Sequence, residues 1–259
     1  MLTPMTAENY NLLLDPIVAD RELERIDKLR ELVKFVAPRL IDANVHDVLA
    51  LRLIHRHHTI NPGEIMVEES GRHNDRSALI TKVVRQKDVD DQDIVPNVFA
   101  VGEIGYEIAE YCMSSILTDL SATEQALANE KLLTEIREKI IELGLKQVVG
   151  LGLRNKHFFH EGGDGQNMLE ITDAEEHANV LLWVQSPTKG RKNIVTLWGF
   201  GPAENTAIHV QNNAATAAFR TWNGIGCDTI VECEFYYDPI SGAQYHEQVY
   251  KHYSYGGLS

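Results

Sequence analysis

The sequence predicts an α+β protein in which a helix followed by an antiparallel β-meander occurs twice, with both copies packed as one body. Three observations support this prediction. Amphipathic helical patterns precede groups of short apolar strands, the second group resembles the first at an offset of one hundred residues, and no proline- or serine-rich linker divides the chain. We assign residues 1–120 to the first half, 121–201 to the second half and 202–259 to an extension that ends in a β-hairpin.

The repeat consists of identical or similar residues at this offset. Asn155 stands one hundred residues after His55, and Lys156 stands one hundred residues after Arg56. The same register holds from the helix through the turn into the strand, which favours duplication over chance. In the strand and just after it, four pairs of positions carry the same residue, namely Val48 and Val148, Leu51 and Leu151, Leu53 and Leu153, and His57 and His157. Leu32 and Leu132, Ile41 and Ile141, and Gly63 and Gly163 are further identical pairs.

In the first half, apolar residues spaced by three and four between Leu23 and Val36 predict an amphipathic helix. Asp20 is its expected cap, and Pro38 is expected to end or kink it. Alternating apolar residues then predict a strand that carries its register through His57. The remaining expected features are a turn at 61–63, a strand at 64–69, a polar loop at 71–76, a strand at 78–84 and one or two strands within 98–112.

The second half repeats this order. A capping box formed by Ser121 and Glu124 predicts the start of a helix that Gly144 ends. Strands are expected at 148–159, 168–172, 179–185 and 193–200, followed by an alanine-rich helix at 206–222 and a hairpin formed by 227–237 and 243–253.

Composition limits the class of protein and its partners. The 259 residues are 44% hydrophobic and 24% charged, which is typical of a globular protein with a sizeable core. A formal charge of −14 argues against nucleic acid and anionic membranes as partners. The N-terminus does not resemble a signal peptide, and three cysteines without CxxC spacing form neither a disulfide framework nor a zinc finger. We therefore expect an acidic, cytoplasmic protein.

The histidines that follow the first alternating strand suggest a metal site. On a strand, His55 and His57 would point the same way, with Cα atoms about 6.5–7 Å apart. His157 is the expected third ligand, because a duplication would bring equivalent strands face to face. Such a set would bind a divalent metal such as zinc or iron. Four further residues are candidates to complete or support it, namely Glu69, Glu170, His160 and Glu161.

A metal-free site is the alternative chemistry. A histidine at the rim of an apolar pocket titrates near neutral pH and acts as a general acid or base, which makes His57 and His157 the candidate catalytic residues. Asn155 in place of His55 would then break the symmetry at the working site. Either chemistry predicts a small-molecule enzyme with a histidine-lined pocket between the halves.

A second functional class remains open beside the enzyme. The same groove and the tyrosine-rich tail would suit a non-catalytic ligand-binding or interaction protein, and the tail hairpin would suit a homodimer contact. Cys227, which follows two glycines, is interpreted as a buried thiol rather than a nucleophile, because no activating group lies near it in the sequence.

The segment LRLIHRHHTINPGEIMVEE resembles a pattern in uncharacterised fungal and bacterial proteins. In that pattern an apolar strand ends in a Leu-His-Arg-His-like segment, before a strand that begins with Gly, Glu and hydrophobic residues. The resemblance covers the first half of the chain and implies no activity.

Overall fold

The computed structural model describes residues 2–160, 167–173, 176–184, 196–200, 230–237 and 244–251. Beyond residue 159, side chains are described for 176–183 and 196–200. The helices are α1 (Ala7–Asn11), α2 (Pro16–Ile26), α3 (Leu29–Asp42), α4 (Leu120–Leu127) and α5 (Glu130–Glu142), with 3-10 turns η1 (Gln86–Asp88), η2 (Ser114–Ile116) and η3 (His157–His160).

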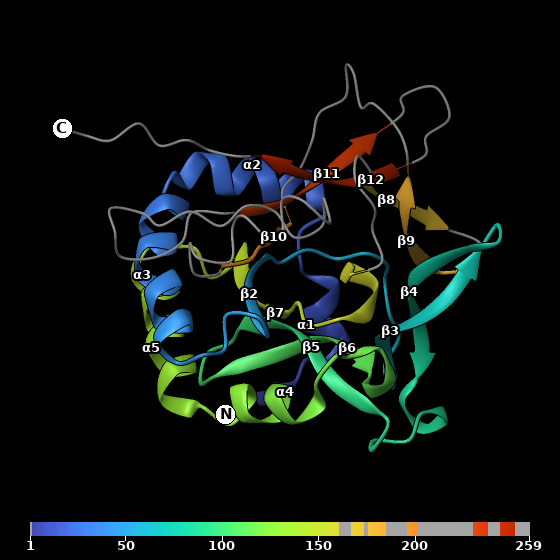
Figure 1. Cartoon of the computed structure of the whole chain (residues 1–259), viewed down its shortest axis with the longest axis horizontal. Helices are drawn as coiled ribbons and strands as arrows, with labels where there is room; N and C mark the ends of the chain where they lie inside the picture. Colours follow the sequence, from blue (N-terminus) through green and yellow to red (C-terminus); the bar gives the residue numbers. More distant parts are fainter. Residues whose placement is uncertain are drawn as a thin grey trace.

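The described strands form one mixed sheet, which confirms the α+β class. Its order is β10-β2-β7-β5-β6-β3-β4-β9-β8-β12-β11, with β1 beside β6 (Figure 1). The strands are β1 (Leu2–Pro4), β2 (Leu49–Leu53), β3 (Glu64–His73), β4 (Arg76–Arg85), β5 (Ile94–Val101), β6 (Tyr106–Met113), β7 (Val149–Leu153), β8 (Asn167–Asp173), β9 (Ala178–Val184), β10 (Leu197–Trp198), β11 (Ile230–Tyr237) and β12 (Gln244–Lys251).

The first predicted helix is two helices, and the predicted cap was wrong. Asp15 caps α2 by accepting a hydrogen bond from Val18 N at 3.0 Å, whereas Asp20 is buried inside the helix. Asp27 adopts a left-handed conformation with φ 50° and ends α2 before α3 begins. Local capping therefore overrides an apolar spacing that runs across both helices.

Pro38 lies inside α3, so it does not end the helix, which was one of the two outcomes predicted for it. A proline within a helix has no N–H for the carbonyl four residues back and crowds the preceding turn. The side chain of Arg39 donates to Phe35 O at 2.8 Å in that turn. The next left-handed residue, Asn44, follows the real end of the helix.

The second predicted helix is also divided in two. Asp119, rather than the predicted Ser121 box, caps α4 by accepting from Ala122 N at 2.8 Å. Asn129 then caps α5 through Leu132 N. A side-chain acceptor before each helix satisfies donors that have no partner within the helix.

The helices α3 and α5 lie side by side and cover the sheet where β2 and β7 meet (Figure 1). Their buried stripes join one apolar core with the leucines of both strands. Arg39 pairs with Glu135 at 3.4 Å and Lys139 pairs with Glu31 at 3.3 Å across the two helices. The main core therefore lies between this helix pair and the centre of the sheet.

The pairing of β2 with β7 relates the two halves reciprocally. Leu51 lies opposite Leu151, and both are fully buried. The hydrogen bond from Ile54 N to Val148 O is 2.8 Å long, and its equivalent from Arg154 N to Val48 O is 2.9 Å long. Each donor and acceptor thus recurs one hundred residues later on the opposite strand.

The same relation recurs on the far side of the sheet. Strands β4 and β9 pair antiparallel, with Ile80 opposite Val180, Ala78 opposite Leu182 and Lys82 opposite Ala178. The predicted meander is nevertheless wrong in one respect, because β2 pairs with β7 and β10 rather than with β3. Strands that precede residue 120 and strands that follow it are therefore interleaved in one sheet.

Two local predictions in the first half were wrong. The segment expected to be a polar loop is a tight hairpin, in which Asn74 and Asp75 adopt φ values of 48° and 63° between β3 and β4. Asn and Asp tolerate such values, so a two-residue turn is possible. Strand β2 ends at Leu53, so His55 and His57 follow the strand rather than lie on it.

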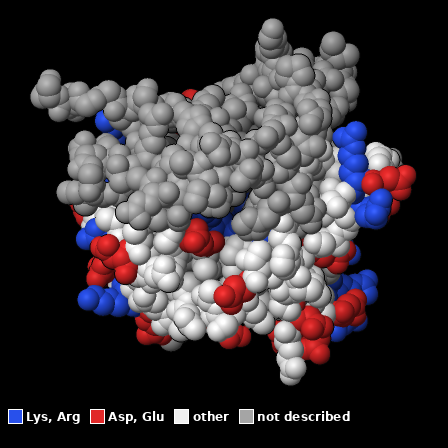
Figure 2. Space-filling view, viewed as in Figure 1, with Lys and Arg blue, Asp and Glu red and all other residues white. Residues whose placement is uncertain are grey.

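Some predictions fall outside the described residues. These include the alanine-rich helix at 206–222 and the turn at 238–242, although β11 and β12 pair antiparallel on either side of that turn. Within the ranges given above, no helix has both the length and the apolar character needed to cross a membrane. Figure 2 shows acidic and basic side chains interspersed over the described part of one face.

Candidate functional site

His57 and Glu110 form a buried acid–base pair between the end of β2 and strand β6. His57 Nε2 lies 3.3 Å from Glu110 Oε1, and the two side chains are only 5% and 3% exposed. The backbone N–H of His57 donates to Tyr10 Oη at 3.4 Å. A carboxylate from a central strand and a tyrosine from α1 therefore fix the position of this imidazole.

His55 packs beside this pair. Its ring centroid lies 4.7 Å from that of His57, and the two rings meet edge to face. His55 Nδ1 lies 2.9 Å from Leu53 O. That carbonyl accepts a hydrogen bond only if Nδ1 carries the proton, which defines the tautomer of the neutral ring.

Tyr10 is fully enclosed in a small apolar cluster that also contains Ile54 and Met66. Burial raises the pKa of Tyr10 well above its usual value, and the nearby carboxylate of Glu110 raises it further. The phenol therefore stays neutral and positions His57 without carrying charge itself.

A second buried pair forms at the end of β7. Lys156 Nζ lies 2.6 Å from Glu68 Oε1, and the side chains are 0% and 7% exposed. Asn97 Nδ2 also approaches this oxygen, at 3.5 Å. The register of β5 against β6 shifts on both sides of Val98, and Asn97 lies at the first shift, where it is fully buried. A buried ion pair with a further donor satisfies charges that would otherwise be costly.

Cys112 lies on β6 directly opposite Glu68 in the parallel pairing of β3 with β6. Burial raises the pKa of its thiol to about 12, and Lys156 opposes that shift only in part. A thiol with this pKa stays protonated near neutral pH and is a poor nucleophile. Cys227 lies outside the described residues, and so does the side chain of Cys233.

Two further histidines meet next to the His57 pair. The ring centroids of His58 and His177 are 5.8 Å apart, so a residue beside β9 reaches the end of β2. Burial lowers the pKa of His58, and the neighbouring His57 lowers it further. A histidine from beyond residue 120 thus lies beside the end of β2, but it is His177, which the sequence interpretation did not single out, rather than the predicted His157.

His157 lies apart from this group. It is exposed at the start of η3, whereas His55 is buried and the side chain of His57 is nearly so. Within the part of the chain that the structure describes, no three side chains of histidine, cysteine, aspartate or glutamate are grouped to hold a metal. The described geometry therefore does not assemble the metal set predicted from these three histidines.

Asn155 has a structural role in the second half. Its Nδ2 donates to Asp119 O at 3.0 Å and to Thr123 Oγ1 at 2.7 Å, which ties the end of β7 to the start of α4. The side chain of His55, one hundred positions before it, instead contacts Leu53 O and the ring of His57. The two strand ends therefore differ in what their polar side chains hold.

The other predicted supporting residues do not reach the histidines or lie outside the described side chains. Glu69 pairs with Lys82 at 2.5 Å, and both side chains are more than one third exposed. Glu170 lies on β8 opposite His246 in register. The side chains of Glu170 and His160, and all of Glu161, lie outside the described part.

The sequence interpretation missed Glu68, Glu110 and Tyr10. Both glutamates stand within apolar stretches that become β3 and β6, and a charged residue at an interior strand position is a signal for burial with a partner. Choosing Glu69 instead of Glu68 placed the carboxylate on the wrong side of the strand. Tyr10 carries no comparable signal, because α1 is a five-residue helix in a polar lead.

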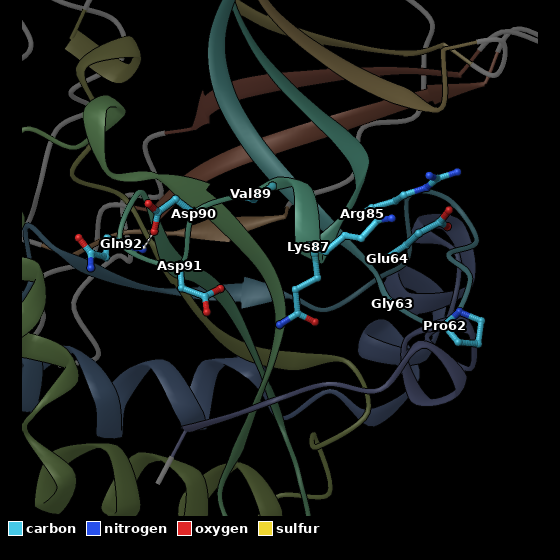
Figure 3. A pocket seen from close by; sticks show the side chains of 10 residues that line it. Pro62, Gly63, Glu64, Arg85, Lys87, Val89, Asp90, Asp91 and Gln92 are labelled. Carbon is cyan, nitrogen blue, oxygen red and sulfur yellow. Dashed lines mark hydrogen bonds between the residues drawn. The ribbon is translucent and has the colours of Figure 1, made fainter.

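A surface hollow of about 950 Å³ lies away from these pairs, where the start of β3 meets the segment after β4 (Figure 3). Gln92 N donates to Asp90 Oδ1 at 3.0 Å in its wall. The lining mixes both signs of charge, and it consists of Pro62, Gly63, Glu64, Arg85, Gln86, Lys87, Val89, Asp90, Asp91 and Gln92.

Comparisons with known proteins assign no family to this arrangement. The chain matches no protein-family model, no curated protein and no solved structure.

Proposed function

We propose that the protein is a small-molecule enzyme that uses metal-free acid–base chemistry at His57. The contact between His57 and Glu110 carries this proposal, because a buried carboxylate that orients an imidazole is the arrangement a general base requires. The described residues bring no third metal ligand to His55 and His57, which favours this chemistry over the metal-assisted alternative.

The proposed chemistry is a proton transfer. Neutral His57 accepts a proton from the substrate on one ring nitrogen while Glu110 holds the other nitrogen. The carboxylate then stabilises the imidazolium, and the low exposure of both groups strengthens this interaction. Tyr10 holds the backbone of His57 in place, so Tyr10 is a positioning residue.

We also propose that the two halves arose by duplication and that only the first half kept the acid–base group. The reciprocal register of β2 with β7 and of β4 with β9 supports this. On this proposal His157 is not catalytic. A homodimer contact through the tyrosines of β11 and β12 stays a prediction. The cytoplasmic location also stays a prediction.

The test compares matched substitutions in the two halves. His57→Gln keeps a donor for Glu110 but cannot shuttle a proton, and His157→Gln makes the same change at an exposed position. Each protein is incubated with a small-molecule extract of cells, and the compounds consumed are identified by mass spectrometry. We expect at least one compound that the wild type and His157→Gln consume and that His57→Gln leaves intact.

Melting temperatures of all three proteins control for folding, and elemental analysis of protein purified without a histidine tag checks for zinc, iron and copper. If no compound distinguishes His57→Gln from the wild type, the enzyme proposal is rejected in favour of a non-catalytic binding protein. Stoichiometric metal that is lost in His57→Gln would restore the metal-assisted alternative.

A further inference from the structure

Arg52 occupies an unusual position near the acid–base pair. It lies on β2 opposite Gly150, and its aliphatic part crosses over Gly152, where a Cβ atom would come within 2.9 Å of Arg52 Cδ. Gly152 thus leaves room for the arginine. Its side chain is neither buried nor fully exposed. A cation is therefore held over the sheet with partial access to solvent.

The other cations near the pair have partners. Arg56 Nη1 donates to Asn11 O at 2.6 Å, and Lys156 pairs with Glu68. Among the described residues, the side chain of Arg52 makes neither a hydrogen bond nor an ion pair, whereas its backbone pairs within the sheet. A guanidinium presents five donors in a planar fork, so Arg52 has its recognition capacity unused.

Arg52 nevertheless belongs to the electrostatic surroundings of the site. Arg52 and Arg56 both act to lower the pKa of Tyr10, against the larger effects of burial and Glu110. Glu110 carries one negative charge beside a neutral His57, so it balances at most one of these two arginines. The site thus carries an uncompensated positive charge in a protein whose formal charge is −14.

Two buried acceptors near the pairs complete the description. Glu110 Oε2 and Asn97 Oδ1 are buried and have no hydrogen-bond partner in the described structure. Buried acceptors are almost always satisfied, so each calls for a donor. A ligand group with an O–H or N–H would supply one.

We infer that the molecule acted on at His57 is a small oxyanion, a carboxylate or a phosphate, whose charged group binds Arg52 and which also carries a hydroxyl or amino donor for Glu110. This inference rests on the proposed function for the location of the reaction. Arginine binds carboxylate and phosphate in the same bidentate manner, so the anion alone does not distinguish the two.

The experiment measures binding of inorganic phosphate, acetate and glycolate by calorimetry at low ionic strength, where screening is weak. Phosphate against acetate separates the two kinds of oxyanion, and glycolate against acetate isolates the hydroxyl. We expect saturable binding of at least one of them to the wild type. Arg52→Gln should weaken it about tenfold or more, because it removes both the charge and the fork.

Arg76→Gln is the matched control, since Arg76 is an exposed arginine on strand β4 and loses the same charge. It should bind like the wild type. Arg52→Lys keeps the charge without the fork and should show intermediate affinity, which guards against a folding defect in Arg52→Gln. Turnover is measured separately in His57→Gln and in Arg76→Gln, so its loss in His57→Gln alone tests the proposed function independently of anion binding. Absence of saturable binding in the wild type, or equal binding by Arg52→Gln, overturns the inference.

Discussion

The segments that contain β2 and β7 are alike in packing and different in chemistry. Leu51 and Leu151 lie opposite each other in the same buried layer, and each strand follows a helix and a left-handed residue. In the segments that directly follow Leu53 and Leu153, the polar side chains make different contacts. The positions that face the partner strand are constrained by each other, whereas the residues after the strand ends contact different neighbours.

The two segments differ in the kind of side chain that each carries at equivalent positions. On one side the strand and its end carry Arg52, His55 and His57, and the equivalent positions on the other side carry a glycine, an asparagine tied to a helix cap and an exposed histidine. At these three positions the segment around β7 thus supplies space and a structural tie, and the segment around β2 supplies ionisable groups that are buried or partly buried. Substitutions at equivalent positions test this division directly.

The largest expected effect is at Lys156. Lys156→Met leaves Glu68 buried without its partner and should lower the free energy of unfolding by about 3–5 kcal/mol. At the equivalent position, Arg56→Met removes a bond to a backbone carbonyl from a partly exposed side chain and should have a smaller effect. Urea denaturation of both variants measures the difference.

The double variant Lys156→Met with Glu68→Leu is the control for that prediction. Replacing both members of a buried pair with apolar residues is often neutral or stabilising. Recovery of most of the lost stability would show that the unpaired carboxylate, rather than a packing defect, destabilises the single variant. Equal effects of Lys156→Met and Arg56→Met would contradict the proposed difference between the copies.

The next effect concerns the core, where the two copies should behave alike. Leu53 and Leu153 are both fully buried in β2 and β7. Leu53→Ala and Leu153→Ala should each lower the free energy of unfolding by about 2–5 kcal/mol, because each leaves a cavity in the same apolar core. Chemical denaturation of the pair is the measurement, and a near-zero effect in either variant would refute the equivalence of the two positions.

A smaller loss of stability is expected for substitutions at Gly150 in β7 and at Ala50, the residue one hundred positions earlier in β2. A Cβ at Gly150 would come within 2.0 Å of Phe99 O, so β5 and β7 must shift to accept Gly150→Ala. Such overpacking lowers stability by about 1–3 kcal/mol. Ala50→Gly removes a buried methyl group from β2 and should lower stability by about 1 kcal/mol. Thermal unfolding measures which of the two variants loses more stability. A smaller loss in Gly150→Ala than in Ala50→Gly would show that β5 and β7 accept the added Cβ without strain.

The sequence was sufficient to predict features that depend on local periodicity. Alternation within β2 and the offset of one hundred residues identified Leu51 and Leu151 as core positions, and both are fully buried. Helix boundaries were missed where Asp27 interrupts an apolar spacing that continues on both sides. Capping acts through one side chain and one N–H, so it contributes little to a periodic pattern.

The candidate site was predicted only in part, since its members come from distant elements. His57 was identified from its place after a strand, but Glu110 reaches it from β6 and Tyr10 from α1, and no spacing connects these three. The expectation that His157 would join them assumed that equivalent histidines face each other. Because β2 and β7 run antiparallel, the segments that follow them leave the pair at opposite ends.

The smallest expected effect is on the pH dependence of stability. Burial lowers the pKa of His58 and of His46, and the positions one hundred residues later hold Phe158 and Lys146, neither of which is a histidine. The unfolded chain therefore binds protons at a higher pH than the folded chain. Stability from these groups is complete above their ordinary pKa of about 6.5 and is lost as pH falls toward the lowered folded values.

His58→Gln and His46→Gln should each flatten the decline of the unfolding free energy between about pH 7.5 and 5.5, a range above most carboxylate titration. Urea denaturation across this range measures the slope. Slopes equal to that of the wild type in both variants would show that the first copy does not carry this sensitivity to acid.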